Sequence, residues 1–225
     1  MFSTPTFDFL RDLKANNSRE WFEANRARWE REGKAPLLAF VQVFAPHLSA
    51  ISPQYESTER SMFRIFRDVR FSKDKSPYKT HLAAQFRHAL VKGPAGEAVH
   101  APGFYLHIAP EGPGEMDGVF GGFGMWQPEG DALRQIRALI QAEPELWLAA
   151  KAGVNFTGSS LKKPPPGIDP AHPLVEDLKR KDFIGVVNFS EADAGRADFV
   201  ERFAAACKSA APLQSFLCRA VGLPF

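Results

Sequence analysis

The sequence predicts an α+β fold, in which a curved, mostly antiparallel sheet packs against N-terminal and C-terminal helices. Three observations support this prediction. Apolar residues recur at helical spacing before residue 52 and again after residue 129, whereas residues 60–126 contain strand-like alternation. The connections between the strand-like stretches are too short for helical crossovers, so neighbouring strands should run antiparallel.

The N-terminal part, residues 1–52, is predicted to be helical. Its clearest helix covers residues 36–51, where apolar side chains step by four and three from Leu37 onward. Gly33 interrupts the helical pattern just before it. Pro46 falls inside the helix, so we expect a kink or an early end at that position.

The middle part, residues 60–126, is predicted to form the sheet and to contain a basic loop. A glycine cluster, Gly121, Gly122 and Gly124, interrupts the last strand, and we interpret it as a bulged hairpin turn. Trp126 beside it is interpreted as a core residue. The predicted strands cover residues 62–67, 81–90, 103–108 and 119–126.

The C-terminal part, residues 129–225, is predicted to contain helices, a proline-rich loop and one further strand. The loop includes the run from Lys162 to Gly167, which has too many prolines for regular structure. No repeat or linker divides the chain, so we expect a single domain of residues 1–225. The predicted helices cover residues 131–141, 145–152, 174–181, 193–209 and 212–221, and the strand covers residues 183–189.

The composition is that of a globular protein with a large core. Hydrophobic residues make up 44% of the chain, and 20 residues are Phe, each of which contributes about 1.5–3 kcal/mol when buried. Cys207 and Cys218 lie among apolar residues, so we interpret both as core thiols. No zinc-like spacing of Cys and His is present, and we expect no metal and no cofactor.

The start of the chain has neither the basic nor the apolar region of a signal peptide. No run approaches 18 consecutive apolar residues, so no membrane span is expected. We therefore predict a cytoplasmic protein. The sequence does not indicate an oligomeric state.

Positive charge is concentrated in one segment. The net charge of the chain is only +2, yet residues 64–79 contain six basic and two acidic side chains, a local net charge of +4. Arginine forks and lysine ammonium groups bind phosphate and carboxylate. The candidate ligand-binding residues of this basic loop are therefore Arg64, Arg67, Arg70, Lys73, Lys75, Tyr78 and Lys79.

A structural interpretation of the same segment stays open. Arg67 or Arg70 can pair with Asp68, Asp74 or Glu20 and fasten the sheet to the helices, because a buried arginine is nearly always paired. In that case, replacing Arg67 or Arg70 with alanine would destabilise the protein strongly.

Three histidine and tyrosine residues could perform acid–base chemistry. Tyr105 and His107 are two positions apart in a predicted strand, so they share one face of the sheet. His81 ends the basic loop, and histidine titrates near neutral pH. The alternative is that these side chains only pack and hydrogen-bond. No Walker A, GxSxG or HExxH motif is present, so the sequence specifies no reaction and leaves open whether the protein is an enzyme.

Three functions follow from these observations. The leading one is binding, with or without turnover, of a small phosphate- or carboxylate-bearing ligand at the basic loop, residues 64–81. The second is nucleic-acid binding through the same loop, with Phe71 and Tyr78 as stacking residues, although the small net charge counts against it. The third is a non-enzymatic protein-interaction domain, in which the arginines are structural or contact an acidic partner.

Nearly the whole chain resembles a family catalogued as the domain of unknown function 2461. Two departures from the family pattern are Phe104, where a second tyrosine is expected, and Phe123, where a smaller residue is expected. The resemblance implies one compact domain and brings no established activity. The matching motifs are Asn17, Arg19–Phe22, Arg64–His81, Gly103–Ile108, Gly121–Gly122 with Trp126 and Pro128, Leu161–Lys162, Pro166–Gly167, His172–Pro173 and Lys179–Phe183.

Overall fold

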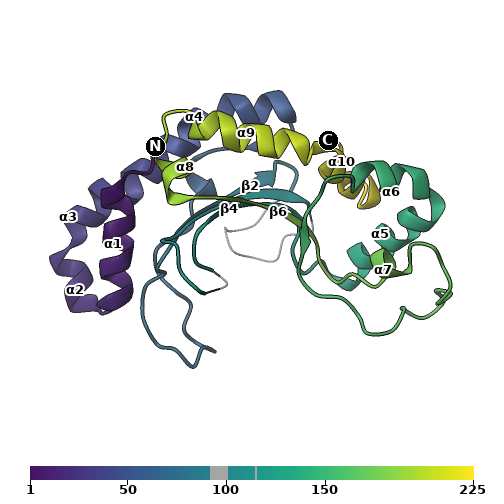
Figure 1. Cartoon of the computed structure of the whole chain (residues 1–225), viewed down its shortest axis with the longest axis horizontal. Coiled ribbons are helices and arrows are strands. Elements are labelled where there is room, and N and C mark those ends of the chain that lie inside the picture. The colour runs from purple at the N-terminus through teal and green to yellow at the C-terminus, as the bar shows by residue number, and fades with distance from the viewer. Residues whose placement is uncertain (92–100, 115) are drawn as a thin grey trace.

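The computed structural model describes residues 1–91, 101–114 and 116–225. Residues 92–100 and 115, which fall within the predicted sheet part, lie outside the described residues. The rest of the chain forms a six-stranded antiparallel sheet with helices over one face and at both ends (Figure 1). This arrangement confirms the predicted α+β fold.

The sheet is a meander with one long excursion. Its strand order is β1-β2-β3-β4-β6-β5, and every neighbouring pair is antiparallel. The predicted strand at residues 62–67 forms only two isolated bridges, Met62 with Ala84 and Phe66 with Tyr78. The strands are β1 (Tyr55–Glu56), β2 (Leu82–His88), β3 (Gly103–Ile108), β4 (Val119–Met125), β5 (Phe156–Thr157) and β6 (Phe183–Phe189).

The N-terminal part is helical, as predicted, but its details differ. The helix does not break at Gly33, because a π-helical turn carries the chain into the next helix. A Cβ atom at Gly33 would lie 2.5 Å from the ring of Trp29, so only glycine leaves room for that indole. The helix also continues past Pro46 rather than ending early. The elements are α1 (Thr4–Ala15), α2 (Arg19–Ala24), α3 (Arg26–Arg28), η1 (Trp29–Lys34), α4 (Ala35–Ile51) and the 3-10 helix η2 (Glu59–Ser61).

The C-terminal part contains the expected helices with one further division. The predicted helix at residues 193–209 is two helices, because Arg196 adopts an extended backbone conformation between them. The elements are α5 (Gly130–Ala142), α6 (Pro144–Ala150), α7 (Val175–Leu178), α8 (Glu191–Gly195), α9 (Phe199–Ser209) and α10 (Ala211–Ala220).

The main core lies between the convex face of the sheet and two helices, α4 and α9, which lie across that face (Figure 1). Alternate side chains of β2 and β3 point into it, among them Phe86, Phe104 and Leu106, none of which is exposed. A second apolar cluster surrounds Trp147 and joins α5, α6 and α10. Both cysteines are buried, which confirms that they are core thiols.

The glycines of β4 do not form a hairpin turn, and that interpretation is wrong. They lie inside a strand that pairs on both sides, with β3 and with β6. A Cβ at Gly121 would lie 3.0 Å from the ring of Phe203, and Gly124 has a φ of +125° beside the Phe183 carbonyl. Close approach of neighbouring groups therefore explains Gly121 and Gly124. Trp126, which follows, is 55% exposed and is not a core residue.

One helical stretch among the described residues, Arg26–Ile51, is long and apolar enough to cross a membrane by length and composition alone. The apolar side chains Leu37, Phe40 and Phe44 are buried in the main core. Packing against the sheet and α9 accounts for these three side chains. The cytoplasmic location stays a prediction.

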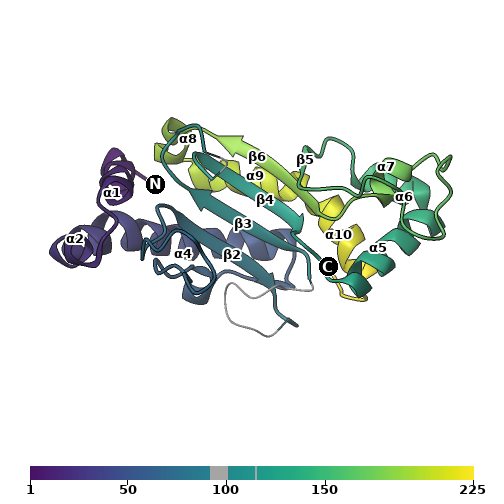
Figure 2. The same ribbon diagram turned by 90° about the horizontal axis from the view of Figure 1, so that it is seen from below.

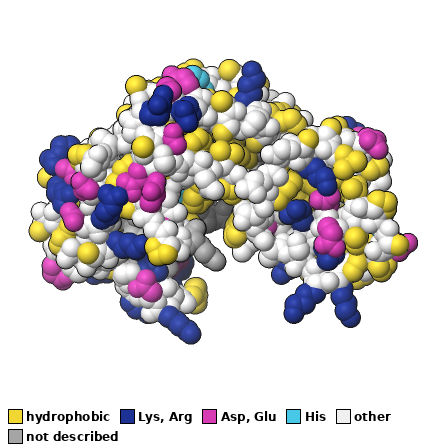
Figure 3. Space-filling view, viewed as in Figure 1, with side chains coloured by type: hydrophobic (Ala, Val, Ile, Leu, Met, Phe, Trp, Pro, Cys, Tyr) yellow, Lys and Arg dark blue, Asp and Glu magenta, His cyan; other side chains and the backbone are white. Residues whose placement is uncertain are grey.

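The opposite, concave face of the sheet is left uncovered by helices (Figure 2). Two parts of the molecule project beyond this face on either side, and the space-filling view shows the surface hollowed between them (Figure 3). One projection is the basic loop that follows Arg64, and the other contains the proline-rich loop between β5 and α7 (Figure 1). Lysine and arginine side chains gather at the ends of both projections (Figure 3).

Candidate functional site

The basic loop is closed at its neck by short backbone pairing. The Arg67 amide donates to the Pro77 carbonyl at 2.9 Å, and the Lys79 amide donates to the Ile65 carbonyl at 2.7 Å. These two bonds flank the Phe66–Tyr78 bridge. The neck therefore extends the β2 edge of the sheet, and the residues between its two sides project from it.

Tyr78 anchors this neck to the N-terminal helices. Its ring is 3% exposed and stacks on Phe22, with ring centroids 4.1 Å apart. Asn17 brackets its backbone, since the Asn17 side chain donates to the Tyr78 carbonyl at 2.9 Å and accepts from the Tyr78 amide at 3.1 Å. The predicted ligand-binding residue Tyr78 thus has its ring engaged in packing.

Arg67 holds the loop together from inside. Its guanidinium donates to the Asp74 carboxylate and to the Ser76 hydroxyl, and reaches the Ser76 carbonyl at 3.2 Å. Ser76 and Arg67 together hold the pKa of Asp74 at about 2, chiefly through the Ser76 amide and hydroxyl. The structural-network interpretation therefore describes Arg67, although the partners lie within the loop rather than in the helical part.

The tip of the loop is exposed and cationic. Arg70 pairs with Asp68 at 2.6 Å, and Lys75 donates to the Val69 carbonyl at 2.9 Å. Phe71 is 95% exposed, and the Arg70 guanidinium lies 5.9 Å from the centre of its ring. Within the described parts of the chain, Lys73 forms neither an ion pair nor a hydrogen bond. The tip therefore presents an unpaired lysine and an aromatic ring to solvent.

The predicted acid–base trio is brought together on the concave face. The rings of His81 and His107 are 4.4 Å apart, and the Tyr105 hydroxyl lies 3.0 Å from His107 Nδ1. Phe120 of β4 stacks on the other side of the His107 ring at 4.4 Å. The strand register explains this arrangement, because His107 pairs with Phe120 across β3 and β4.

The hydrogen bonds of His107 fix its tautomer. Its Nε2 lies 2.9 Å from the Met116 carbonyl, which can only accept, so Nε2 carries the proton. Nδ1 is then the acceptor for the Tyr105 hydroxyl. His81 differs, since no described residue hydrogen-bonds to its ring nitrogens. The trio thus contains one fully engaged imidazole and one that is available to a ligand.

Both imidazoles are neutral over the physiological pH range. Burial, with smaller contributions from nearby His107, Lys79 and Arg67, lowers the pKa of His81 to about 3. Burial also lowers the pKa of His107 to about 4, against the opposing effect of the Met116 carbonyl. The same burial raises the pKa of Tyr105. The positive field of Lys79 and Arg67 therefore reaches the cluster.

Lys79 and Phe63 join the loop to this cluster. The Lys79 ammonium lies 4.9 Å from the centre of the Phe63 ring and donates to the Arg64 carbonyl at 3.0 Å. Phe63 meets Tyr105 edge to face, with centroids 6.1 Å apart. The base of the basic loop and the His81–Tyr105–His107 cluster therefore form one continuous surface on the concave face.

Sequence reasoning placed the trio on one surface but missed its aromatic walls, Phe63 and Phe120. Phe120 could have been assigned to the site from the sequence, because it lies in a predicted strand beside the strand of His107, two positions before Gly122. Phe63 carried none, because its segment does not form a regular strand. In the described ranges, no three His, Cys, Asp or Glu side chains are grouped to hold a metal.

Comparison with known families establishes the family membership of the chain. A sequence model of the family described as conserved hypothetical protein (DUF2461) matches residues 5–216. The chain belongs to this family. The match confirms the resemblance seen in the sequence motifs. No curated protein and no solved structure matches the chain. The description of DUF2461 names no activity, so the function is argued from the geometry of the site.

Proposed function

We propose that the concave face beside the basic loop binds a small phosphate- or carboxylate-bearing anion. The observation behind this proposal is the His81 ring, which has no hydrogen-bond partner among the described residues and lies in the positive field of Lys79 and Arg67. Tyr105 adjoins it through His107. A partly buried polar ring without a protein partner next to cations fits an incoming anionic acceptor.

The chemistry of the cluster gives each group a part in binding. Lys79 supplies the nearest ammonium, and its pKa is lowered by burial and by Arg64. An anion placed beside His81 would raise the pKa of that imidazole, because an opposite charge favours the protonated form. The Tyr105 hydroxyl donates to His107, so its oxygen lone pairs are oriented to accept from a hydroxyl of the ligand.

Proton uptake follows from this arrangement. His81 is neutral in the free protein at neutral pH, and a bound anion favours its charged form. Anion binding should therefore strengthen as the pH falls from 8 to 6. A neutral His81 with a pKa of about 3 is a weak base, so any turnover would depend on the bound anion to adjust that pKa. We assign no reaction.

A thermal-shift screen at low salt tests the proposal. The probes are inorganic phosphate, nucleotides, sugar phosphates and dicarboxylates, applied to the wild type, Lys79→Ala and His81→Phe. A probe at one hundred times its Kd should stabilise the protein by about 2.7 kcal/mol, and both variants should lose the shift. Lys208→Ala, an exposed lysine on α9, serves as the matched control. No shift with any probe, or a shift in both site variants as large as that of the wild type, would contradict the proposal.

Nucleic-acid binding is a second candidate, favoured by one observation. Phe71 is 95% exposed between cations at the loop tip, as a base-stacking residue would be. A fluorescein-labelled oligothymidine should bind at low salt, weaken steeply with added salt and lose affinity in Phe71→Ser. Binding that Phe71→Ser leaves intact would remove the loop tip from this role. Tyr78, the other predicted stacking residue, has its ring packed on Phe22.

A further inference from the structure

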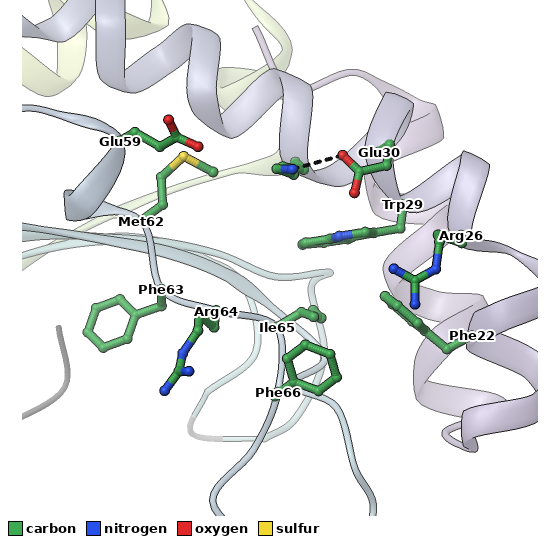
Figure 4. A pocket seen from close by; sticks show the side chains of 11 residues that line it. Phe22, Arg26, Trp29, Glu30, Glu59, Met62, Phe63, Arg64, Ile65 and Phe66 are labelled. Carbon is green, nitrogen blue, oxygen red and sulfur yellow. Dashed lines mark ion pairs between the residues drawn. The ribbon is translucent and has the colours of Figure 1, made fainter. Parts of the chain in front are cut away.

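A second surface lies on the other side of the segment that leads into the basic loop. It is a pocket of about 330 Å³ between the N-terminal helices and residues 62–66 (Figure 4). Phe22 and Trp29 line it from the helices, and Met62, Ile65 and Phe66 line it from the segment. Phe66 is 57% exposed. The pocket thus offers an aromatic and aliphatic lining that is open to solvent.

The shape of this pocket depends on the π-helical turn. Trp29 begins that turn, and its ring occupies the space that a side chain at Gly33 would fill. Figure 4 shows the indole of Trp29 facing the gap toward Met62 and Ile65. Such π-helical distortions within helices are frequent at functional sites. The Trp29 ring therefore lines the pocket while it also packs against Phe9 and Phe22.

The segment beside the pocket has one open backbone edge. The amides of Phe63 and Arg67 donate to β2-side carbonyls, and the Ile65 carbonyl accepts from Lys79. In the described structure, the alternate amides of Arg64 and Phe66 have no hydrogen-bond acceptor. This alternation is that of a backbone edge with one side open, on which the Arg64 carbonyl accepts from the Lys79 ammonium at 3.0 Å and keeps a second lone pair for a peptide amide. Unpaired strand edges accept an extended peptide by adding it as a further strand.

The charged side chains around the pocket indicate which peptide fits. Arg26 is held by Glu23 at 2.6 Å, and Lys34 is held by Glu30 at 3.0 Å. Among the described residues, two charged lining residues are left without an ion pair, namely the acidic Glu59, which lies beside Met62 (Figure 4), and the basic Arg64. Arg64 lies toward the basic loop, which it begins and whose net charge is +4. An acidic side chain at that end would be complementary to both Arg64 and the loop.

We propose that residues 62–66 bind an extended peptide segment of a partner protein by strand addition. One apolar side chain of the peptide occupies the Trp29–Phe66 pocket, and a neighbouring acidic residue pairs with Arg64. The backbone edge contributes affinity, and the pocket and Arg64 contribute specificity. This surface faces the N-terminal helices, whereas the anion site around His81 lies on the concave face, and Phe63 adjoins both because it lines the pocket and contacts Tyr105.

Fluorescein-labelled octapeptides test the proposal in solution. The first probe has a central phenylalanine in a threonine–valine repeat with flanking aspartates, and the second has lysines in place of the aspartates. We expect saturable binding of the acidic probe below about 1 mM and weaker binding of the basic probe. Equal or tighter binding of the basic probe, or no binding of either, would overturn the proposal.

Variants locate the binding surface. Arg64→Glu should weaken the acidic probe about fivefold or more, and Phe66→Ser should weaken it about tenfold through lost apolar contact. Both side chains are exposed, so the variants should fold, which their melting curves check. Lys208→Glu and Phe71→Ser are matched controls outside the pocket and should bind as the wild type does. Equal losses in the controls and the pocket variants would refute the assignment.

Backbone methylation separates strand addition from simple pocket filling. Two further acidic probes contain N-methyl groups on alternate amides, one on each edge of the extended peptide. Only the probe methylated on the edge that faces the protein should lose binding. If both methylated probes bind, or neither does, strand addition is wrong. Displacement of the acidic probe by oligothymidine but not by unlabelled peptide would show a nucleic-acid surface instead.

Discussion

The two faces of the sheet are made by the same strands and differ in nearly every physical respect. On the convex face, Phe86, Phe104 and Leu106 are buried beneath α4 and α9. On the concave face, the alternate positions of the same strands hold Tyr105 and His107, which hydrogen-bond to each other. The two-residue period of a strand thus separates stability from chemistry. Four measurements test how sharp this separation is.

The largest effect is expected on the convex face. Phe104→Ala removes a fully buried ring and should lower the free energy of unfolding by about 3–5 kcal/mol, as measured by urea denaturation. Phe120→Ala on the concave face removes a ring that is only partly covered, so its loss should be at most about half as large. Equal losses would show that the two faces carry the core together.

The next effect is a pH dependence that belongs to the concave face. His81 has a pKa of about 3 in the folded state and an ordinary value near 6.5 when unfolded. Below pH 6.5 the unfolded chain therefore binds a proton that the folded protein does not, and stability falls. Between pH 7 and pH 5 this histidine should remove about 2 kcal/mol from the free energy of unfolding.

His81→Phe keeps a ring at this position and removes the titration. Its free energy of unfolding should fall about 2 kcal/mol less than that of the wild type over the same pH interval. Denaturation curves at both pH values give the comparison. Parallel losses in the two proteins would mean that His81 is protonated in the folded state at pH 5, and that its environment is more polar than its burial indicates.

A smaller effect distinguishes the neck from the tip of the loop that borders the concave face. Arg67→Ala should cost about 1–2 kcal/mol, because the guanidinium holds Asp74 and Ser76 in place. Arg70→Ala should leave the melting temperature unchanged, because its pair with Asp68 is exposed. A large loss in the Arg70 variant would indicate that this guanidinium has a partner beyond Asp68.

The smallest effect concerns the bond that organises the concave face. A double-mutant cycle of Tyr105→Phe and His107→Phe should give a coupling energy of about 1 kcal/mol, the usual contribution of one hydrogen bond. Urea denaturation of the four proteins provides it. Additive losses would mean that water replaces the bond at no cost and that the hydroxyl is free for a ligand.

Periodicity predicted the elements well, because spacing of apolar residues depends on local geometry alone. The helix at residues 36–51 and the strand at residues 103–108 follow directly from it. The glycines of β4 were misread because their reason is tertiary. Gly121 makes room for Phe123, two positions along the strand, and for Phe203, which lies in α9 far along the chain. A glycine in a strand pattern is equally consistent with a bulge, a turn or a close contact.

The site shows the same division between local and distant causes. That Tyr105 and His107 share a face follows from their spacing, and the structure brings His81 to them. The fate of Tyr78 could not be predicted in this way, because Phe22 and Asn17, which enclose it, belong to the N-terminal helices. Charge patterning located the basic loop but could not show which cations pair within it.

The long excursion between β4 and β6 affects how the protein can be rebuilt. Met125, the last residue of β4, pairs with Phe183, the first residue of β6. The segment between them, about a quarter of the chain, therefore leaves the sheet and re-enters it at neighbouring positions. The segment between β4 and β6 is therefore suited to insertion or exchange of whole segments, because the pairing of these two strands does not depend on the length of the chain between them. Removal of this segment would expose part of α10, because Phe216 and Leu217 of that helix pack in the apolar cluster to which the segment contributes. A shortened chain would need polar substitutions at those two positions.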